Sequence, residues 1–107
     1  MIYEEVEMMV LCRLAYESLL KTALSQDELI DNAILLYDRE NSIGTSIEDA
    51  ETLIYAKQEV TKIVKAIRQI LKDSDYSVRD VQVIVYYTRL LELIVKNVRK
   101  VIFSHGS

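Results

Sequence analysis

The scarcity of turn-forming residues constrains the fold of this chain more than any other feature of its sequence. In 107 residues there is no proline, and Gly44 and Gly106 are the only glycines. Tight turns rely heavily on these two residue types, so a fold built from many short elements is excluded. The sequence therefore predicts an all-α protein with a few long helices and short connections.

Three helix starts are marked by a hydroxyl side chain that is followed three residues later by an acid. These pairs are Ser25 with Glu28, Thr45 with Glu48, and Ser77 with Asp80. The hydroxyl can accept a hydrogen bond from an exposed backbone N–H, and the acid lies near the positive helix end. We predict helices over residues 2–24, 26–41, 46–73 and 77–103, in one domain covering residues 1–107. Because the connections are short, these helices should form an up-down-up-down antiparallel four-helix bundle.

The predicted helix over 46–73 has the most regular apolar pattern. Its apolar residues alternate in spacings of three and four: Leu53, Ala56, Val60, Ile63, Ile67 and Ile70. Such a heptad-like seam is typical of a helix that packs one face against a single core. The helix over 26–41 is also amphipathic, and it turns acidic residues outward: Asp27, Asp31, Asp38 and Glu40.

The first and last predicted helices carry more apolar residues than one buried face requires. In the segment MMVLCRLAY, residues 8–16, only Arg13 is charged. Surplus apolar surface on two helices implies a further body that covers it, and a two-fold homodimer is the commonest such assembly. The alternatives are a different protein that covers the surface, or a central position of both helices in the bundle. The candidate interface residues are Val6, Met9, Val10, Leu14, Val83, Tyr87, Leu90 and Ile94.

The sequence offers little support for catalysis or for a cofactor. The single cysteine, Cys12, and the single histidine, His105, cannot form a Cys/His metal cluster, and there is no glycine-rich phosphate loop. We therefore predict no catalytic residues, no cofactor and no metal. An acidic start, a lone cysteine and no apolar run near 20 residues favour a cytoplasmic protein without a membrane segment. Abundant charges with few amides hint at a thermophilic source.

The C-terminal segment RKVIFSH places five residues between Arg99 and His105. This spacing resembles the Arg-x(4–6)-His motif of the HEPN superfamily, whose members are small helical bundles. The resemblance implies a dimeric ribonuclease in which His105 is the acid/base and Arg99 contacts phosphate. A second alternative is nucleic-acid binding through the basic stripe of Arg89, Lys96, Arg99 and Lys100, although the net charge of −4 disfavours it.

The function that the sequence favours is protein binding without chemistry. We expect a small structural, adaptor or inhibitory subunit of a larger assembly, with a second copy of the chain as its first partner. Its acidic outer residues would also suit a basic protein partner. The ribonuclease and nucleic-acid hypotheses remain as alternatives.

Overall fold

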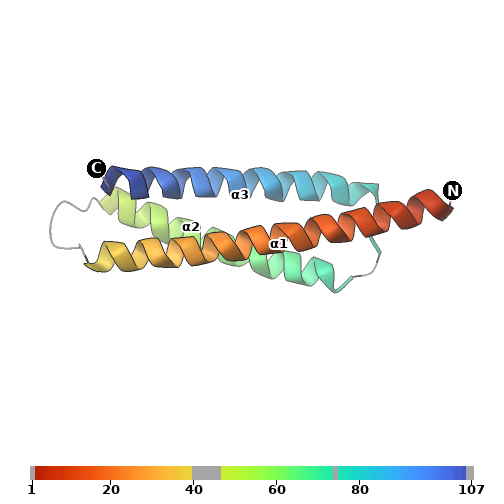
Figure 1. The fold of residues 1–107 in the computed structure, drawn as a ribbon, viewed down its shortest axis with the longest axis horizontal. Coiled ribbons are helices and arrows are strands. Elements are labelled where there is room, and N and C mark those ends of the chain that lie inside the picture. The colour runs from red at the N-terminus through yellow and green to blue at the C-terminus, as the bar shows by residue number, and fades with distance from the viewer. Residues whose placement is uncertain (1, 40–46, 74, 106–107) are drawn as a thin grey trace.

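The computed structural model describes residues 2–39, 47–73 and 75–105, and within these ranges it is all-α. The three helices are α1 (Ile2–Arg39), α2 (Ile47–Leu71) and α3 (Val78–His105). They lie side by side in an elongated bundle of 62 × 20 × 16 Å, in which α2 runs antiparallel to α1 and α3 (Figure 1). None of the three combines the length and the hydropathy needed to cross a bilayer. The predicted all-α class is confirmed.

The prediction of four helices is wrong, because residues 2–24 and 26–41 do not form separate helices. α1 continues through Ser25 without a break and ends only at Arg39. A hydroxyl three residues before an acid permits a cap but does not force one, and no glycine or proline interrupts the helix there. Packing then decides in favour of one long helix, and the fold is a three-helix bundle.

The buried residues of α1 show why the helix is continuous. They recur at alternating spacings of four and three across the predicted break: Cys12, Tyr16, Leu19, Ala23, Gln26, Ile30 and Ala33. A seam of this kind keeps one face of a helix toward its neighbours over many turns. Gln26 occupies one position of this seam, and its Oε1 is buried without a hydrogen-bond partner among the described residues.

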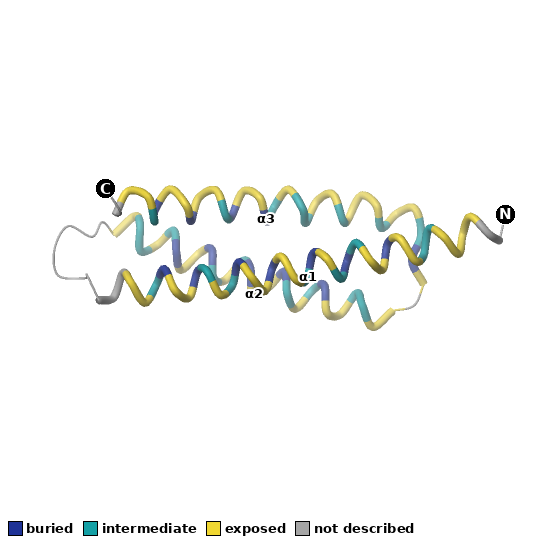
Figure 2. Tube along the Cα trace, in the orientation of Figure 1, coloured by how far each residue is buried: buried dark blue, intermediate teal, exposed yellow. Residues whose placement is uncertain are grey.

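The other two helices contribute matching seams, and buried positions line the inner side of each helix in Figure 2. On α2 the buried residues are Leu53, Ala56, Val60, Ile63 and Ile67, which confirms the pattern predicted for this helix. On α3 they are Leu91, Ile94, Val98 and Val101. Ile84 and Tyr87 extend this last seam toward the start of α3 and pack against the core.

The cap predicted at the start of α3 is confirmed for its acid, Asp80, but not for the Ser77 hydroxyl, which has no hydrogen-bond partner among the described residues. The Ser77 backbone N–H donates to Asp80 Oδ2 at 2.8 Å, and the Asp80 N–H donates to the Ser77 carbonyl at 2.9 Å. Together they satisfy backbone groups that a helix start leaves exposed. The other predicted cap, at Thr45, lies outside the described residues, although α2 begins at Ile47 beside it.

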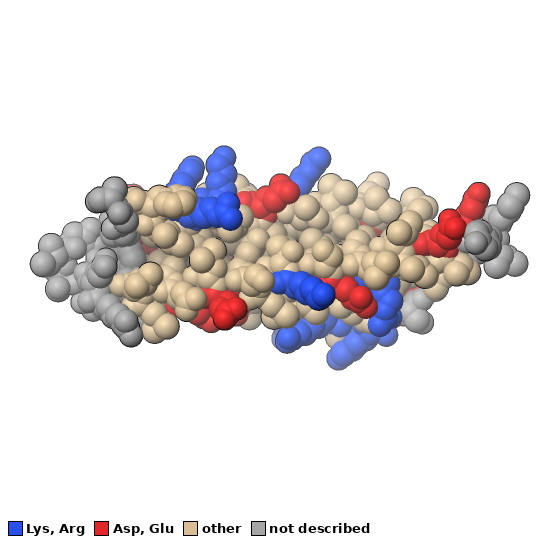
Figure 3. Space-filling model, viewed as in Figure 1, with Lys and Arg blue, Asp and Glu red and all other residues tan. Residues whose placement is uncertain are grey.

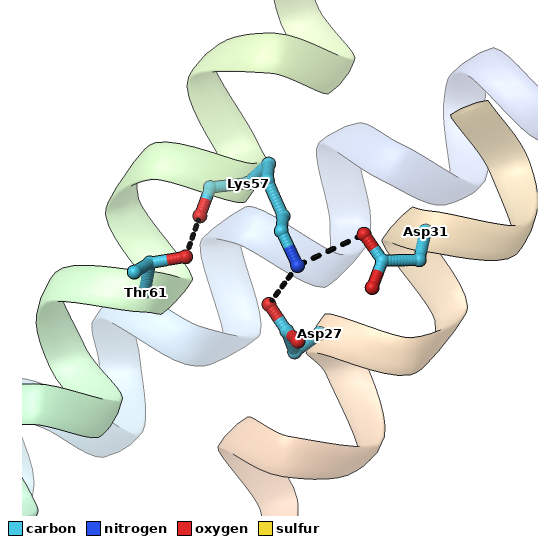
Figure 4. A network of polar contacts seen from close by, with 4 residues as sticks. All are labelled: Asp27, Asp31, Lys57 and Thr61. Atoms are coloured by element: carbon cyan, nitrogen blue, oxygen red, sulfur yellow. Dashed lines mark hydrogen bonds and ion pairs between the residues drawn. The ribbon is translucent and has the colours of Figure 1, made fainter.

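An ion-pair network sets the alignment of α1 against α2. Lys57 Nζ on α2 lies 2.7 Å from Asp27 Oδ1 and 2.9 Å from Asp31 Oδ1 on α1 (Figure 4). The hydrogen bonds to Asp27 and Asp31 raise the pKa of Lys57, although burial opposes the shift. Two of the acids predicted to face a basic partner are thus paired within the chain. The side chains of the other two, Asp38 and Glu40, lie outside the described residues.

A buried tyrosine sets the alignment of α1 against α3. The Tyr16 hydroxyl donates to Asp80 Oδ1 at 2.7 Å, and its ring packs against Tyr76 at a centroid distance of 5.6 Å. Burial raises the pKa of Tyr16, and the hydrogen bond to Asp80 adds to the rise. Burial alone would raise the pKa of Asp80, but the hydrogen bonds from Ser77 and Tyr16, with the charge of Arg79, lower it. This contact joins the first turn of α3 to the second quarter of α1.

Candidate interaction surface

The N-terminal part of α1 extends beyond the ends of both other helices. α3 begins beside Cys12 and Tyr16, since the Cys12 thiol lies 3.7 Å from the Ser77 carbonyl oxygen. α2 ends at Leu71, about 14 residues past Lys57. Because Lys57 pairs with Asp27 and α2 runs antiparallel to α1, Leu71 lies level with the same stretch of α1, near Tyr16. Residues 2–11, called the arm below, therefore project past the bundle, as Figure 1 shows at the N-terminus.

The arm and the turn after it expose large aliphatic side chains. Val6, Val10, Leu11 and Leu14 are 53%, 52%, 61% and 55% exposed. They lie on the side of α1 opposite its buried seam, where neither α2 nor α3 packs, and Leu24 farther along the same side is likewise 39% exposed. Contiguous apolar surface of this kind is typical of a protein-binding site.

One side of the arm is covered. Met8 and Met9 pack against the core, and beside them a pocket of about 670 Å³ is lined by Tyr76, Ser77 and Arg79 from the connection into α3. The arm is thus held by the bundle on one side and exposed on the other. It is a continuation of α1 with a fixed direction.

A groove with basic walls runs along the middle of the molecule between α1 and α2. It has a volume of about 670 Å³, with Leu24 and Val64 among its apolar lining residues and Lys65, Arg68 and Lys72 among its charged ones. The arm, by contrast, carries Glu4, Glu5 and Glu7 and no basic residue. Figure 3 shows acidic side chains at the projecting end and basic ones gathered along this middle edge.

The structure separates the predicted interface residues into two groups. Val6, Val10, Leu14 and Val83 are exposed, whereas Met9, Tyr87 and Leu90 are partly buried against the core. Ile94 is 5% exposed and belongs to the core seam of α3. It offers no surface to a second protein, because its side chain already packs within the bundle.

The residues of the two alternative hypotheses lie on α3. Arg89, Lys96, Arg99 and Lys100 are exposed along its outer side. His105 is the last residue of α3, and its side chain lies outside the described residues. The structure therefore does not show how the side chains of Arg99 and His105 lie relative to each other.

Other reactive groups are arranged for stability. Burial, with a smaller contribution from the charge of Asp80, raises the pKa of the Cys12 thiol, which favours the protonated form over the nucleophilic thiolate. No group of three or more His, Cys, Asp and Glu side chains is placed to hold a metal ion in the described ranges. The hydroxyl of Ser77 is buried without a hydrogen-bond partner there, beside the backbone groups that cap α3.

Comparison with known proteins shows no match to this chain. No family model, no curated protein and no solved structure is significantly similar to it. The HEPN resemblance thus rests on Arg99 and His105 alone, and the surface must be interpreted from its own chemistry.

The sequence singled out Val6, Val10 and Leu14 but not Leu11, which is the most exposed of the four. Which side of α1 is left exposed is set by its packing on α2 and α3, which depends on contacts between distant residues. The groove was missed for the same reason, since Leu24 and Lys65 meet only when α1 and α2 align. The unbroken four-and-three spacing through Ala23 and Gln26 was the available signal for a single long α1.

Proposed function

We propose that this protein is a non-enzymatic protein–protein interaction module whose docking surface is the arm of α1. The observation that carries the proposal is the exposure of Val6, Val10, Leu11 and Leu14 on a helix end that no other element covers. In water, burying four such side chains against a partner stabilises the complex by roughly 25 cal/mol per Å² of apolar area removed from solvent. A structural, adaptor or inhibitory subunit needs such a surface and no catalytic group.

The helical conformation of the arm supports this proposal. Met8 and Met9 pack against the core on one side, so the exposed side chains are presented on a helix that is already formed. A partner that binds it therefore has little backbone to order, which lowers the entropic cost of association.

The test compares thiol labelling at two matched positions. Val10→Cys lies in the arm, and Leu93→Cys lies on the outer side of α3, where the native residues are 52% and 54% exposed. With the thiols freshly reduced and the reductant removed, we expect a maleimide to label position 10 more slowly than position 93, either in concentrated purified protein or in extract of the source cells. Equal labelling rates under both conditions would contradict the proposal.

A further inference from the structure

We infer that the partner covering the arm is a second copy of this chain, packed antiparallel along α1 with the two-fold axis near Leu14. This inference rests on the proposed function and names the occupant of the same surface. The two copies would bury each other's exposed aliphatic side chains and bring the acidic arm of each over the basic middle of the other. The contact is isologous, so it closes as a dimer.

The charges on the exposed side of α1 are arranged to match an inverted copy of the same helix. Glu7, Leu14 and Lys21 are spaced seven residues apart, which is two helical turns, so they lie in one line along α1. Leu14 is midway between an acid and a base. A two-fold axis at Leu14 therefore places Glu7 of each copy opposite Lys21 of the other.

Neither end of this line has an ion-pair partner among the residues that the structure describes. Glu7 and Lys21 are exposed and form no ion pair with any described residue, whereas Arg13 and Glu17 between them are already joined at 3.2 Å. An antiparallel copy satisfies both unpaired charges at once. A parallel copy would set Glu7 against Glu7 and Lys21 against Lys21, which is repulsive.

The aliphatic side chains are covered in the same arrangement, although only Leu14 meets an aliphatic residue directly. The axis places Leu14 against Leu14 of the second copy, where the native side chain is 55% exposed. It sets Val6 opposite Thr22 and Val10 opposite Ser18, both small side chains that leave room for a close approach of the two helices. One axis thus pairs Glu7 with Lys21 and brings Leu14, Val10 and Val6 into the contact.

The long-range charges favour the same orientation. The arm carries Glu4, Glu5 and Glu7, and the antiparallel packing lays it along the part of the second copy where the groove is basic. The cations there are Lys65, Arg68 and Lys72 of α2. Opposite fields on the two approaching surfaces speed association and select the orientation, more strongly at low salt.

Charge reversal tests this arrangement, because a symmetric contact predicts rescue by mixing. Solution mass is measured by light scattering after size exclusion from about 1 to 200 μM. We expect Glu7→Lys and Lys21→Glu each to weaken the dimer about tenfold, because each change creates two like-charge contacts. An equimolar mixture of the two variants should restore it, since both contacts in the mixed dimer again join opposite charges.

Arg89→Glu provides the control for Lys21→Glu, because it makes the same change of charge on the exposed side of α3. It should leave the solution mass of the dimer unchanged. Two weakened variants that stay weak when mixed would overturn the antiparallel arrangement. A wild-type monomer at every concentration would overturn the second copy as the partner. In that case the labelling of Val10→Cys in cell extract still tests the arm as a docking surface for another protein, so the two failures are distinguishable.

Discussion

The arm and the middle of α1 belong to one continuous helix and are similarly rich in apolar residues, yet the middle is buried along its whole inner side and the arm only at Met8 and Met9. Between Cys12 and Ala33 every position of the seam is buried against α2 and α3. Before Leu11 the helix has no neighbour on its outer side, and Val6 and Val10 are exposed. Burial is therefore decided by what lies opposite a residue, and hydropathy alone does not predict it. Four substitutions test this contrast and the contacts that produce it.

The largest effect is expected from truncating one side chain to alanine in the buried middle of α1 and comparing it with the same truncation in the arm. Ile30→Ala removes a core side chain in the middle of α1 that is 1% exposed, and should lower the free energy of unfolding by about 3 kcal/mol. Leu11→Ala also truncates an aliphatic side chain. Because Leu11 is exposed, its truncation leaves no cavity and should lower the free energy of unfolding of the monomer by under about 0.5 kcal/mol. Urea unfolding at low protein concentration measures both, and equal losses would refute the contrast.

The next effect concerns the contact that holds α3 beside Tyr16. The pKa of Asp80 is lowered in the folded protein. Its contribution to stability is therefore fully present above the pKa of Asp in the unfolded chain, about 3.9. That contribution is lost as the pH falls through the folded value. Asp80→Asn should cost about 1–2 kcal/mol at pH 7. It should also flatten the decline in stability between about pH 5 and pH 2. An unchanged acid profile in thermal unfolding would exclude this role.

A smaller gain is expected at the polar position of the α1 seam. Gln26 is 9% exposed, and its Oε1 lacks a partner among the described residues. Gln26→Leu keeps the approximate volume, removes the buried polar group and should stabilise the bundle by about 1 kcal/mol. A loss of stability in urea unfolding would show that the amide is satisfied in solution.

The smallest effect is expected at the ion-pair network of Figure 4. Lys57, Asp27 and Asp31 are all partly exposed, so Lys57→Gln should cost only about 0.5 kcal/mol. The loss should shrink further in 1 M salt, because screening weakens the wild-type pairs. A loss that is the same at low and high salt would point to packing of the lysine stem instead.

Much of the fold could be predicted from local pattern. The seam of α2 from Leu53 to Ile67 and the acid of the cap at Asp80 are local signals, and both are confirmed, whereas the hydroxyl of Ser77 does not take the role predicted for it. The start of a separate helix at Ser25 is a local signal too, but it misled because a capping sequence is compatible with a helix interior. The four-and-three spacing through Gln26 was stronger evidence, since it links the seam on both sides of Ser25.

The candidate site was less predictable. Val6, Val10 and Leu14 could be singled out from surplus hydropathy, but Ile94 was grouped with them although it lies in the core. On α3 two apolar faces compete, and only contact with α1 and α2 determines which is buried. The overhang of the arm depends on the Tyr16 to Asp80 alignment, which joins residues 64 positions apart and leaves no local signature.

The interface proposed on the exposed side of the arm can be tested on the intact chain. Its most direct test is the solution mass of the wild-type chain and of the double variant Val6→Asp, Val10→Asp, measured by light scattering from about 1 to 200 μM. The account predicts a wild-type mass near twice 12.4 kDa at high concentration and a helical, monomeric double variant. A double variant with the same mass and the same concentration dependence as the wild type would contradict it.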